Sequence, residues 1–492
     1  MTRVLLLVVV LALAAGCSTT AGAGSGGSGG PSPSPVAASA PADVARGVDA
    51  LVAAAEEHPG GGRAWASVIQ APHRQVDRDV GAAGIAAGLL AVAEGAPDAA
   101  VRDRALDTAR DAADFLVAAQ RGPGRFPDYV DPGPDGGEWA PAGYAYSSYD
   151  DGAAGVADLL WSVGERTGEQ RYRDVALDAA AWLVERAEDV PGAPACPAVC
   201  RWAWSDDGEP SYRNGMGEGQ AGIVYALSVL AERSGDRRLA EYAAGGGAYL
   251  LTQQGPDGGM PERADVSARN TGFLSGAAGA AFSFLRLYQA TGEQRFRDGA
   301  SRALEFLDRS AVEDRGGRTW PIWVDPTGAV GNPRRATGME EGAAGIGWVS
   351  LQAAAILDDD AHRERAEAAG RWLLAVADTR DGGTSWPEFE GASTTHLSTN
   401  SGAAGTGWYL DTLGRVTGET SYRDAAVGAQ RFLAGAQLPD GSWPSNLTDG
   451  RPRLVGEPSW HWGTAGVLGF LTRMSGGPMD TPAMQPPLVP LG

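Results

Sequence analysis

The stretch Gly402-Ala403-Ala404-Gly405, followed by Thr-Gly-Trp-Tyr-Leu, decides the fold of this chain. It is one of seven copies of a Gly-x-x-Gly step that opens a strongly apolar segment, and successive copies lie 57 to 71 residues apart. The copies begin at Gly81, Gly152, Gly219, Gly276, Gly342, Gly402 and Gly463. A spacing this regular indicates one structural unit repeated around an axis, so functional groups are expected where the units meet.

Each apolar segment alternates with an amphipathic one. Residues 167–184 place apolar side chains at helical spacing, whereas the segment after Gly219 is apolar on nearly every side. The first pattern is typical of a helix with one face in solvent, and the second of a buried helix. We therefore expect seven inner helices that begin at the glycine pairs and seven outer helices that begin near Ala42, Val101, Gln170, Arg237, Gln294, Ala361 and Thr420.

This strict alternation predicts an all-α fold, an (α/α)7 toroid. All inner helices then run parallel, so that their N-termini and the loops before them open on one end of the ring. That end, the mouth, collects seven positive helix-dipole poles and any polar residue that precedes Gly-x-x-Gly.

The N-terminal residues predict a lipoprotein signal peptide over residues 1–16. Arg3 is followed by an apolar run at residues 4–13 that is too short to span a bilayer, and Ala14-Ala15-Gly16-Cys17 resembles a bacterial lipobox. The alternative is an ordinary secretory signal cleaved after Ala15 or Gly16. We expect Cys17 to be lipidated and the protein to be held on the extracytoplasmic side of a membrane.

Three further segments complete the predicted organisation. Residues 17–41 contain the lipidated cysteine and a flexible Gly/Ser/Pro-rich tether. Residues 42–474 form the toroid, and residues 475–492, which are rich in proline, are expected to be a disordered tail.

The net charge and the cysteine content limit the possible binding partners of the protein and the bonding of its cysteines. The formal charge of −21 argues against nucleic acid, whose phosphates need clustered basic side chains. Cys196 and Cys200 are expected to form a local disulfide, which an oxidising compartment permits. The alternative, a metal pair, lacks a nearby His or Cys to complete a tetrahedral set. We expect a monomer.

Seven Gly-x-x-Gly inner helices with outer partners resemble the lanthionine synthetase C-like (LanC-like) family. The resemblance covers residues 42–474. It implies a zinc ion at the mouth that activates the thiol of a peptide cysteine for addition to a dehydroamino acid, closing a thioether ring. The family takes its ligands from a Cys just before the fifth glycine pair and a Cys-His pair just before the sixth.

This chain departs from the family pattern at all three ligand positions. Glu340 stands in the place of the first Cys, and Asn400 and Ser401 stand in those of the second Cys and the His. A histidine that the family often has before the third pair is also missing, since Gly217 precedes Glu218 there. We therefore do not expect zinc, nor standard thioether cyclisation.

Carboxylates are concentrated just before the glycine pairs. With one histidine they make up the candidate catalytic residues, which are Asp150, Asp151, Glu218, Glu340, Glu341 and His461. The doubled acids, Asp150-Asp151 and Glu340-Glu341, could act across the mouth as general acid and base for glycoside hydrolysis, or could bind Ca²⁺. For Asp151, Ser275 and Ser401, which stand directly before an expected helix, the alternative is helix capping.

Histidines and neighbouring polar or aromatic residues give the candidate binding groups. His58, His73 and His362 are expected at the surface, while His461 lies directly before the last glycine pair. His461 is either a packed, hydrogen-bonded histidine or a general base or metal ligand that faces Glu340 or Asn400. The binding residues expected around it are His396, Asn400, Ser401, Trp460, Trp462 and Arg335.

Three functional hypotheses follow. The first is a membrane-anchored LanC-like protein that binds or modifies a peptide in its central cup. The second is a carbohydrate-active enzyme, a glycoside hydrolase or lyase, that uses the paired carboxylates. The third is a lipoprotein that binds a peptide or glycan without catalysis.

Overall fold

A computed structural model describes residues 40–70, 72–133, 139–327, 330–332, 334–477 and 487–491. The predicted signal peptide, Cys17 and nearly all of the predicted tether lie outside these residues. Residues 38–492 form one compact unit. No helix in the described ranges is long and apolar enough to cross a bilayer.

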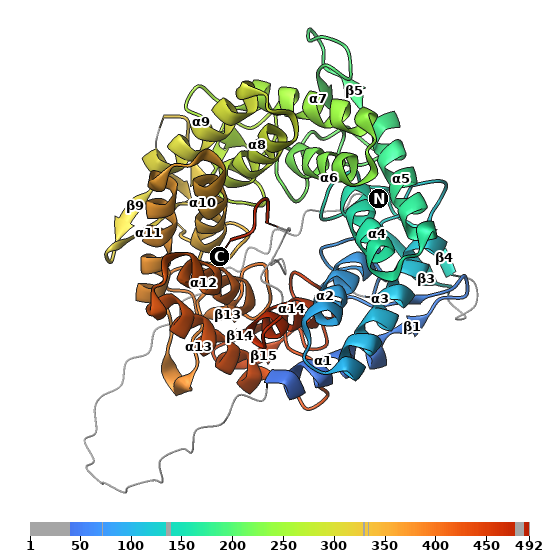
Figure 1. Cartoon of the computed structure of the whole chain (residues 1–492), viewed down its shortest axis with the longest axis vertical. Helices are drawn as coiled ribbons and strands as arrows, with labels where there is room; N and C mark the ends of the chain where they lie inside the picture. The colour runs from blue at the N-terminus through green and yellow to red at the C-terminus, as the bar shows by residue number, and fades with distance from the viewer. Residues whose placement is uncertain are drawn as a thin grey trace, which may run out of the picture. The chain divides into compact units, whose positions relative to one another are not determined.

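The described part of the chain contains fourteen α-helices that alternate between an outer and an inner ring (Figure 1). The outer helices are α1 (Ala40–Ala54), α3 (Ala99–Ala119), α5 (Gln170–Glu185), α7 (Arg237–Gln253), α9 (Gln294–Ser310), α11 (Asp360–Val376) and α13 (Thr420–Ala436). The inner helices are α2 (Ala82–Gly95), α4 (Ala153–Thr167), α6 (Gln220–Ser234), α8 (Ala277–Thr291), α10 (Ala343–Leu357), α12 (Ala403–Thr417) and α14 (Thr464–Met474). The prediction of seven outer and seven inner helices in an (α/α)7 toroid is confirmed.

The ring is closed by contacts between its first and last units. Each inner helix contacts the next one along the chain, and α14 contacts both α2 and α1. Every inner helix is buried over most of its length, which agrees with its uniformly apolar sequence. The units therefore share one continuous hydrophobic core.

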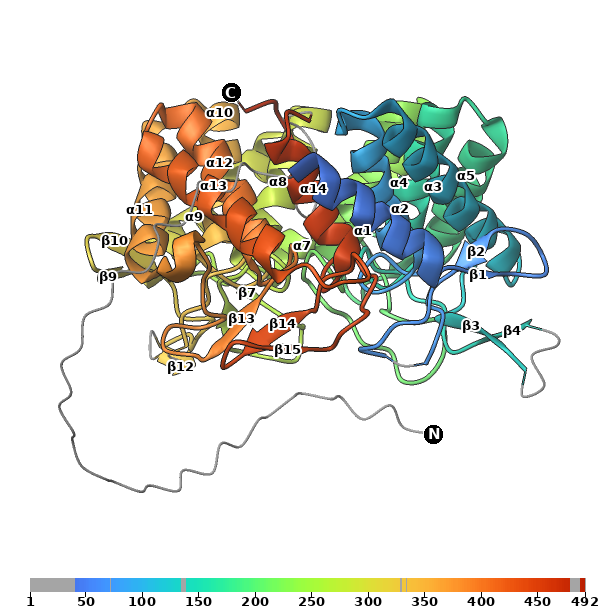
Figure 2. The same ribbon diagram turned by 90° about the horizontal axis from the view of Figure 1, so that it is seen from below.

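Short antiparallel strands lie in the loops, which gather at one end of the ring (Figure 2). Two-stranded sheets join β1 (Glu56–Glu57) to β2 (Arg63–Ala64), β3 (Tyr129–Pro132) to β4 (Trp139–Ala142), β5 (Glu188–Asp189) to β6 (Cys200–Arg201), and β9 (Val312–Asp314) to β10 (Gly317–Thr319). A four-stranded sheet has the order β12 (Val330–Asn332), β11 (Trp323–Val324), β8 (Arg269–Asn270), β7 (Met260–Pro261). A three-stranded sheet has the order β13 (Thr394–His396), β14 (Asn446–Thr448), β15 (Arg451–Arg453), and one 3-10 helix, η1, spans Arg380–Gly382.

The second glycine of every pair is required by a close backbone contact. A Cβ atom on Gly155 would lie 1.8 Å from the carbonyl oxygen of Tyr149, and the same contact, to the residue six positions earlier, recurs in all seven units at 1.8–2.2 Å. The side chain of that earlier residue then packs on the second glycine of the next unit, as Tyr149 does on Gly222. Because Trp460 of the last unit packs on Gly84 of the first, this series of contacts also closes on itself.

Buried tryptophans fill the space behind the outer helices. Trp320, for example, donates its indole N–H to the carbonyl of Leu307 in α9 at 2.7 Å. Trp65, Trp202, Trp386 and Trp443 make the equivalent bond to a leucine of the preceding outer helix, and all five tryptophans are fully buried. These side chains therefore stabilise the ring and are not available to bind a ligand.

Two predictions about less regular segments can be compared with the structure. Cys196 and Cys200 form a disulfide with a Cα–Cα distance of 5.1 Å. The tail differs from the prediction of disorder over residues 487–491, because the backbone N–H groups of Leu488 and Val489 donate to the Gln352 side chain, at 2.7 and 3.0 Å. Residues 478–486 and 492 lie outside the described residues.

The glycine contacts predict that two glycine-to-alanine substitutions have opposite effects on the free energy of unfolding. In Gly405→Ala the new Cβ would lie 1.9 Å from the Thr399 carbonyl, so we expect a loss of about 2–4 kcal/mol in the free energy of unfolding. Gly435→Ala, in α13, meets nothing within 4 Å and should instead stabilise by about 0.5–1 kcal/mol. Urea denaturation of residues 17–492 carrying Cys17→Ser measures both, and equal effects would contradict the packing described here.

Candidate functional site

A closed belt of backbone hydrogen bonds surrounds the mouth. The belt runs through the residue that lies two positions before the first glycine of each pair, and we call these seven residues the mouth ring. They are Asp79, Asp150, Gly217, Leu274, Glu340, Asn400 and His461. N–H groups at or next to each position donate to the carbonyl of the ring residue in the following unit, with N–O distances of 2.7–3.4 Å, and His461 N–H closes the belt on Asp79.

The belt brings four ionisable side chains of the mouth ring together from units far apart in sequence. Asp79 and His461 are 382 residues apart, yet the Nδ1 of His461 lies 3.0 Å from Oδ1 of Asp79. The indole N–H of Trp462 donates to the same oxygen at 2.9 Å. Asp79 therefore fixes the orientation of the His461 ring and leaves its Nε2 for another partner.

Several polar atoms of the mouth ring are buried without a hydrogen-bond partner in the described structure. They are Oδ1 of Asp150, Oδ1 of Asn400 and Nε2 of His461. All three residues are almost completely buried, at 3, 1 and 2% exposure. Buried polar atoms are normally satisfied, so three orphaned atoms in one ring indicate a place where a polar ligand or water binds.

The ring carboxyls differ in proton affinity. Burial raises the pKa of Asp150 to about 6, with a further rise from Asp79, while His461 and Arg78 oppose it. Burial also raises the pKa of Glu340, together with Glu341 and Asp79, to about 8. At neutral pH Asp150 is therefore mainly a carboxylate and Glu340 mainly a carboxylic acid.

The acids around His461 favour its protonated form. Burial alone would lower the pKa of His461, but the charge of Asp150 and the hydrogen bond and charge of Asp79 outweigh that effect and raise it. The mouth ring thus combines a carboxylate, a carboxylic acid and a histidine whose pKa is raised. Two titrating groups whose environments separate their pKa values are the usual arrangement for acid–base chemistry.

Asp151, Glu341 and Ser401 form a second layer directly behind the ring. Asp151 accepts a hydrogen bond from the Trp204 indole at 3.0 Å, and burial raises its pKa to about 7. Glu341 bonds with Ser275 and Asn270, and burial raises its pKa to about 7 as well. Ser401 Oγ lies 3.4 Å from Oε2 of Glu340, so it supports an acid of the ring.

Helix capping does not explain these residues. The N-cap of each inner helix is the first glycine of its pair. The side chains of Asp151, Ser275 and Ser401 instead bond with Trp204, Glu341 and Glu340, and not with N–H groups of the helices that follow them. The capping interpretation of Asp151, Ser275 and Ser401 is therefore wrong. Asp77, a fully buried acid of the first unit, does bond N–H groups before a helix, those of Val80 and Gly81 at 2.8 Å each.

Four predicted site residues lie outside the cluster. Trp460 is fully buried and packs on Gly84 and Gly469, so it supports the ring and cannot contact a ligand. Arg335 pairs with Glu390 and lies 3.5 Å from Asp314, away from the mouth ring. Glu218 pairs with Arg213 and its side chain is 42% exposed, which places it on the outer rim.

His396 is the fourth of these residues and lies at the edge of the mouth. Its ring contacts the edge of Trp462, with centroids 5.5 Å apart, and its Nε2 lies 3.6 Å from Glu388. It does not contact the mouth ring directly. His362, expected at the surface, is instead buried beside Arg365 in α11.

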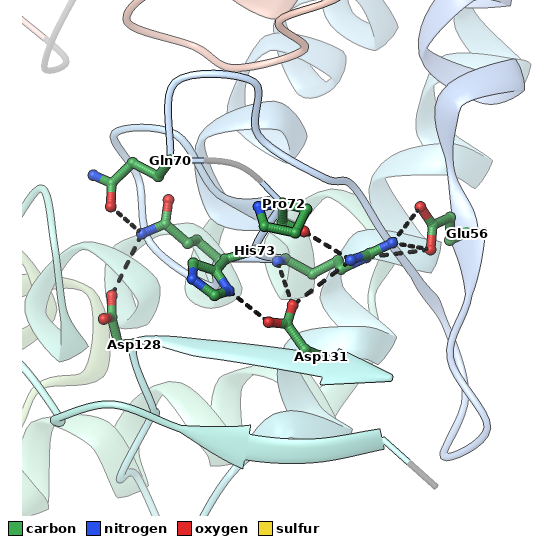
Figure 3. A network of polar contacts seen from close by, with 8 residues as sticks. Glu56, Gln70, Pro72, His73, Asp128 and Asp131 are labelled. Atoms are coloured by element: carbon green, nitrogen blue, oxygen red, sulfur yellow. Dashed lines mark hydrogen bonds and ion pairs between the residues drawn. The ribbon is translucent and has the colours of Figure 1, made fainter. Parts of the chain in front are cut away.

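A polar network fixes the rim between the first two units (Figure 3). The Nδ1 of His73 lies 2.5 Å from Asp131, and the His73 ring stacks on Tyr129. Arg74 donates to Glu56, and its backbone N–H donates to Asp131 at 3.0 Å. Because the charged groups are paired with one another, this network explains the loop's geometry without a ligand.

The donor set of the mouth does not fit zinc. The three positions that would hold ligands carry a protonated Glu340 and the neutral oxygens of Asn400 and Ser401, with no thiolate among them. The nearby imidazole of His461 is bound to Asp79 and its pKa is raised, whereas a histidine ligand must be neutral. Within the described ranges no three His, Cys, Asp or Glu side chains are grouped so that they could hold a metal ion, including Ca²⁺.

Comparison with known proteins agrees with this architecture. Residues 261–478 match the family model of the lanthionine synthetase C-like proteins. Over these residues the chain is similar to the LanC-like family. The match includes the mouth-ring residues Leu274, Glu340, Asn400 and His461.

Solved structures that resemble this LanC-like protein share its fold at low sequence identity. A nisin cyclase aligns with a TM-score of 0.53 and 12% identity over 82% of this chain and 89% of its own. A D-mannose isomerase aligns at 0.54 and 13%, covering 73 and 93% of the two chains, and a sugar epimerase from a ruminal bacterium at 0.54 and 15%, covering 74 and 95%. A search of curated proteins gives no significant match.

The sequence analysis did not select Asp79 as a site residue of this LanC-like protein. A usable signal was present, because Asp79 stands two residues before the first glycine pair, as Asp150 and Glu340 do before theirs. Aligning the seven units by their glycines would have placed it in the mouth ring. Its bond to His461 and the bond from Trp204 to Asp151 could not be predicted, since they join different units.

The raised pKa values predict how stability depends on pH. The folded protein keeps a proton on Glu340 up to a pH of about 8, whereas the unfolded chain releases it near its ordinary value, so stability falls as pH rises between about 5 and 8. Asp150, Asp151 and Glu341 act in the same direction. Between pH 5 and 8 the free energy of unfolding of Glu340→Gln should therefore rise relative to that of the wild type by up to about 1.4 kcal/mol per pH unit. Solvent screening at the partly open mouth reduces this difference.

Urea denaturation at pH 5, 6.5 and 8 measures this gain. Glu364→Gln, an exposed position on α11, is the matched control and should follow the wild type at every pH. A Glu340→Gln curve parallel to that of the wild type would contradict the raised pKa.

Proposed function

We propose that this LanC-like protein is a carbohydrate-active enzyme that cleaves a glycosidic bond by general acid–base catalysis at the mouth ring. The observation that carries the proposal is that one ring of side chains contains two carboxyl groups with separated pKa values, Asp150 at about 6 and Glu340 at about 8. Glycoside hydrolysis needs two carboxyl groups in these two protonation states.

Each group has a defined role in this reaction. Glu340 gives its proton to the oxygen of the leaving sugar as the bond to the anomeric carbon breaks. Asp150 accepts a proton from the water that forms the new bond to that carbon, so the two carboxyls exchange protonation states and the products carry the elements of water. His461, held by Asp79, offers its buried, unpartnered Nε2 as a hydrogen-bond partner for a substrate hydroxyl.

A sugar also suits the surroundings of the ring. Asn400 offers a buried, unpaired carbonyl oxygen to a hydroxyl group, and half-buried Trp204 and Trp462 lie behind Asp151 and Asp79. Sites of this kind combine apolar and aromatic walls with a few fixed polar groups. Two other proteins with this fold, a D-mannose isomerase and a sugar epimerase, are named for reactions of sugars.

A second candidate is a protein that binds or modifies a peptide in the central cup. The LanC-like match over residues 261–478 favours it, because that stretch carries four of the seven ring residues, and a nisin cyclase has the same fold. The absence of a fitting zinc donor set weighs against thioether chemistry by the family's metal-dependent route. Binding of a peptide or a glycan without catalysis is the remaining outcome.

Turnover of an oligosaccharide panel tests the acid–base proposal. We expect Asp150→Asn and Glu340→Gln each to lower kcat by roughly 10²- to 10⁴-fold, and Glu364→Gln to have no effect. The pH profile should be bell-shaped with limbs near 6 and 8, because Asp150 must be ionised and Glu340 protonated. No release of reducing sugar from any substrate, together with near-stoichiometric zinc in the purified protein, would contradict the proposal and favour the peptide.

We also propose that the protein is anchored to a membrane through an acylated Cys17 and faces the extracytoplasmic side. Support comes from the apolar run at residues 4–13 and the Ala-Ala-Gly-Cys sequence that ends at Cys17. A single acyl chain binds weakly, so stable anchoring needs the two or more chains of a bacterial lipoprotein or a second contact.

Metabolic labelling with palmitate tests the anchor. We expect the wild-type protein to incorporate label and to sediment with membranes, and Cys17→Ser to lose the label. Cys196→Ser/Cys200→Ser, which removes the other two cysteines, is the matched control and should keep the label. Label that persists in Cys17→Ser would contradict this site.

A further inference from the structure

A continuous exposed strip lies at the mouth end of the toroid, where Figure 2 shows β15. Residues 451–456, Arg-Pro-Arg-Leu-Val-Gly, are all exposed and comprise β15 and the turn after it. Leu454 and Val455 are 42 and 50% exposed. They are the two most exposed of the four large hydrophobic residues that lie open to solvent in the described part of the chain.

A third exposed hydrophobic residue, Ile69, is held beside this strip. The carboxylate of Glu457 accepts the backbone N–H groups of Val68 and Ile69, at 2.8 and 3.1 Å. Glu457 follows Val455 by two residues, so this buried acid joins the loop of the first unit to the turn of the last. We call Ile69, Arg451, Arg453, Leu454 and Val455 the docking strip.

The arginines of the strip are not engaged elsewhere. Both Arg451 and Arg453 are exposed, and neither side chain has a hydrogen bond or an ion pair with the described residues, although the backbone of both pairs with β14. Arginine and proline on an edge strand protect it from pairing with other chains, which accounts for Arg451-Pro452-Arg453. That protection does not account for the exposed Leu454 and Val455, because hydrophobic groups at an edge promote association.

Exposed aliphatic side chains flanked by unpaired arginines are the combination that binds the surface of an anionic bilayer. The aliphatic groups enter the boundary between headgroups and acyl chains, and the arginines attract the anionic headgroups. The whole protein carries a formal charge of −21. Attraction to an anionic surface must therefore come from a local site of a few basic residues, because salt screens the charges farther away.

We propose that the docking strip binds the surface of an anionic membrane and so turns the mouth toward the bilayer. The strip and the mouth ring lie at the same end of the toroid, since β15 leads into the loop before α14. The proposal does not depend on the acid–base function. It predicts that substrates reach the mouth from the membrane surface.

The predicted anchor is compatible with this orientation. Helix α1 (Ala40–Ala54) starts at the end of the ring opposite the mouth and spans about 22 Å. A chain from Cys17 to residue 39 can extend to roughly 75–80 Å. The tether is therefore long enough for the mouth end to reach the bilayer.

One acidic residue next to the strip opposes binding. Asp449 is exposed in the turn between β14 and β15, two residues before Arg451. Its charge should repel an anionic surface, so Asp449→Asn provides a change expected to strengthen binding. A variant that binds the membrane more strongly is a useful test, because damage to the fold cannot explain stronger binding.

Vesicle sedimentation of residues 17–492 with Cys17→Ser tests the proposal without any acyl chain. We expect binding to vesicles of phosphatidylglycerol and phosphatidylcholine, and little to phosphatidylcholine alone. Arg451→Gln/Arg453→Gln should lower partitioning by roughly 10- to 30-fold and Leu454→Ser/Val455→Ser by at least roughly tenfold, while Asp449→Asn should raise it several-fold.

Matched controls use exposed residues outside the strip. Val312→Ser, at the fourth exposed hydrophobic residue, and Arg237→Gln/Arg423→Gln should bind like the parent protein. Equal losses in these controls, or no vesicle binding by the parent, would overturn the proposal. Binding to heparin but not to vesicles would assign the strip to a soluble polyanion and overturn it as well.

Discussion

The whole structure depends on the closed belt of backbone hydrogen bonds at the mouth. Each bond joins one unit to the next, and the bond from His461 to the Asp79 carbonyl joins the last unit to the first. The glycine pairs allow the belt to form, because a side chain on the second glycine would collide with the carbonyl six residues earlier. Ring closure and the position of the functional groups therefore have the same physical cause.

Because the belt uses only backbone atoms, the side chains of the mouth ring are free to vary without loss of the fold. In this LanC-like protein the ring contains Asp79, Asp150, Glu340, Asn400 and His461, which provide oxygen and imidazole groups but no thiolate. The same framework can thus carry different sets of functional side chains. Burial at the mouth then separates the pKa values of Asp150 and Glu340 and gives the two acids different roles.

The helices could be predicted from local sequence, whereas the site depends on contacts between residues that are far apart in the chain. The starts of all outer helices were predicted within two residues, since hydrophobic periodicity and the glycine pairs are local signals. The same repeat placed Asp150, Glu340, Asn400 and His461 at the mouth. It could not show that Asp79 binds His461, that Trp460 is fully buried against Gly84, or that Arg335 pairs with Glu390, because each contact joins segments far apart in the chain.

The central claim is that the mouth ring holds one ionised and one protonated carboxyl group at neutral pH. The most direct measurement is a ¹³C NMR titration of carboxyl-labelled Asp and Glu in the folded protein, with Asp150→Asn and Glu340→Gln used to assign the two signals. The account predicts that the Asp150 signal titrates near pH 6 and the Glu340 signal near pH 8. Titration of both signals together near pH 4 would show two ordinary carboxylates and would contradict the account.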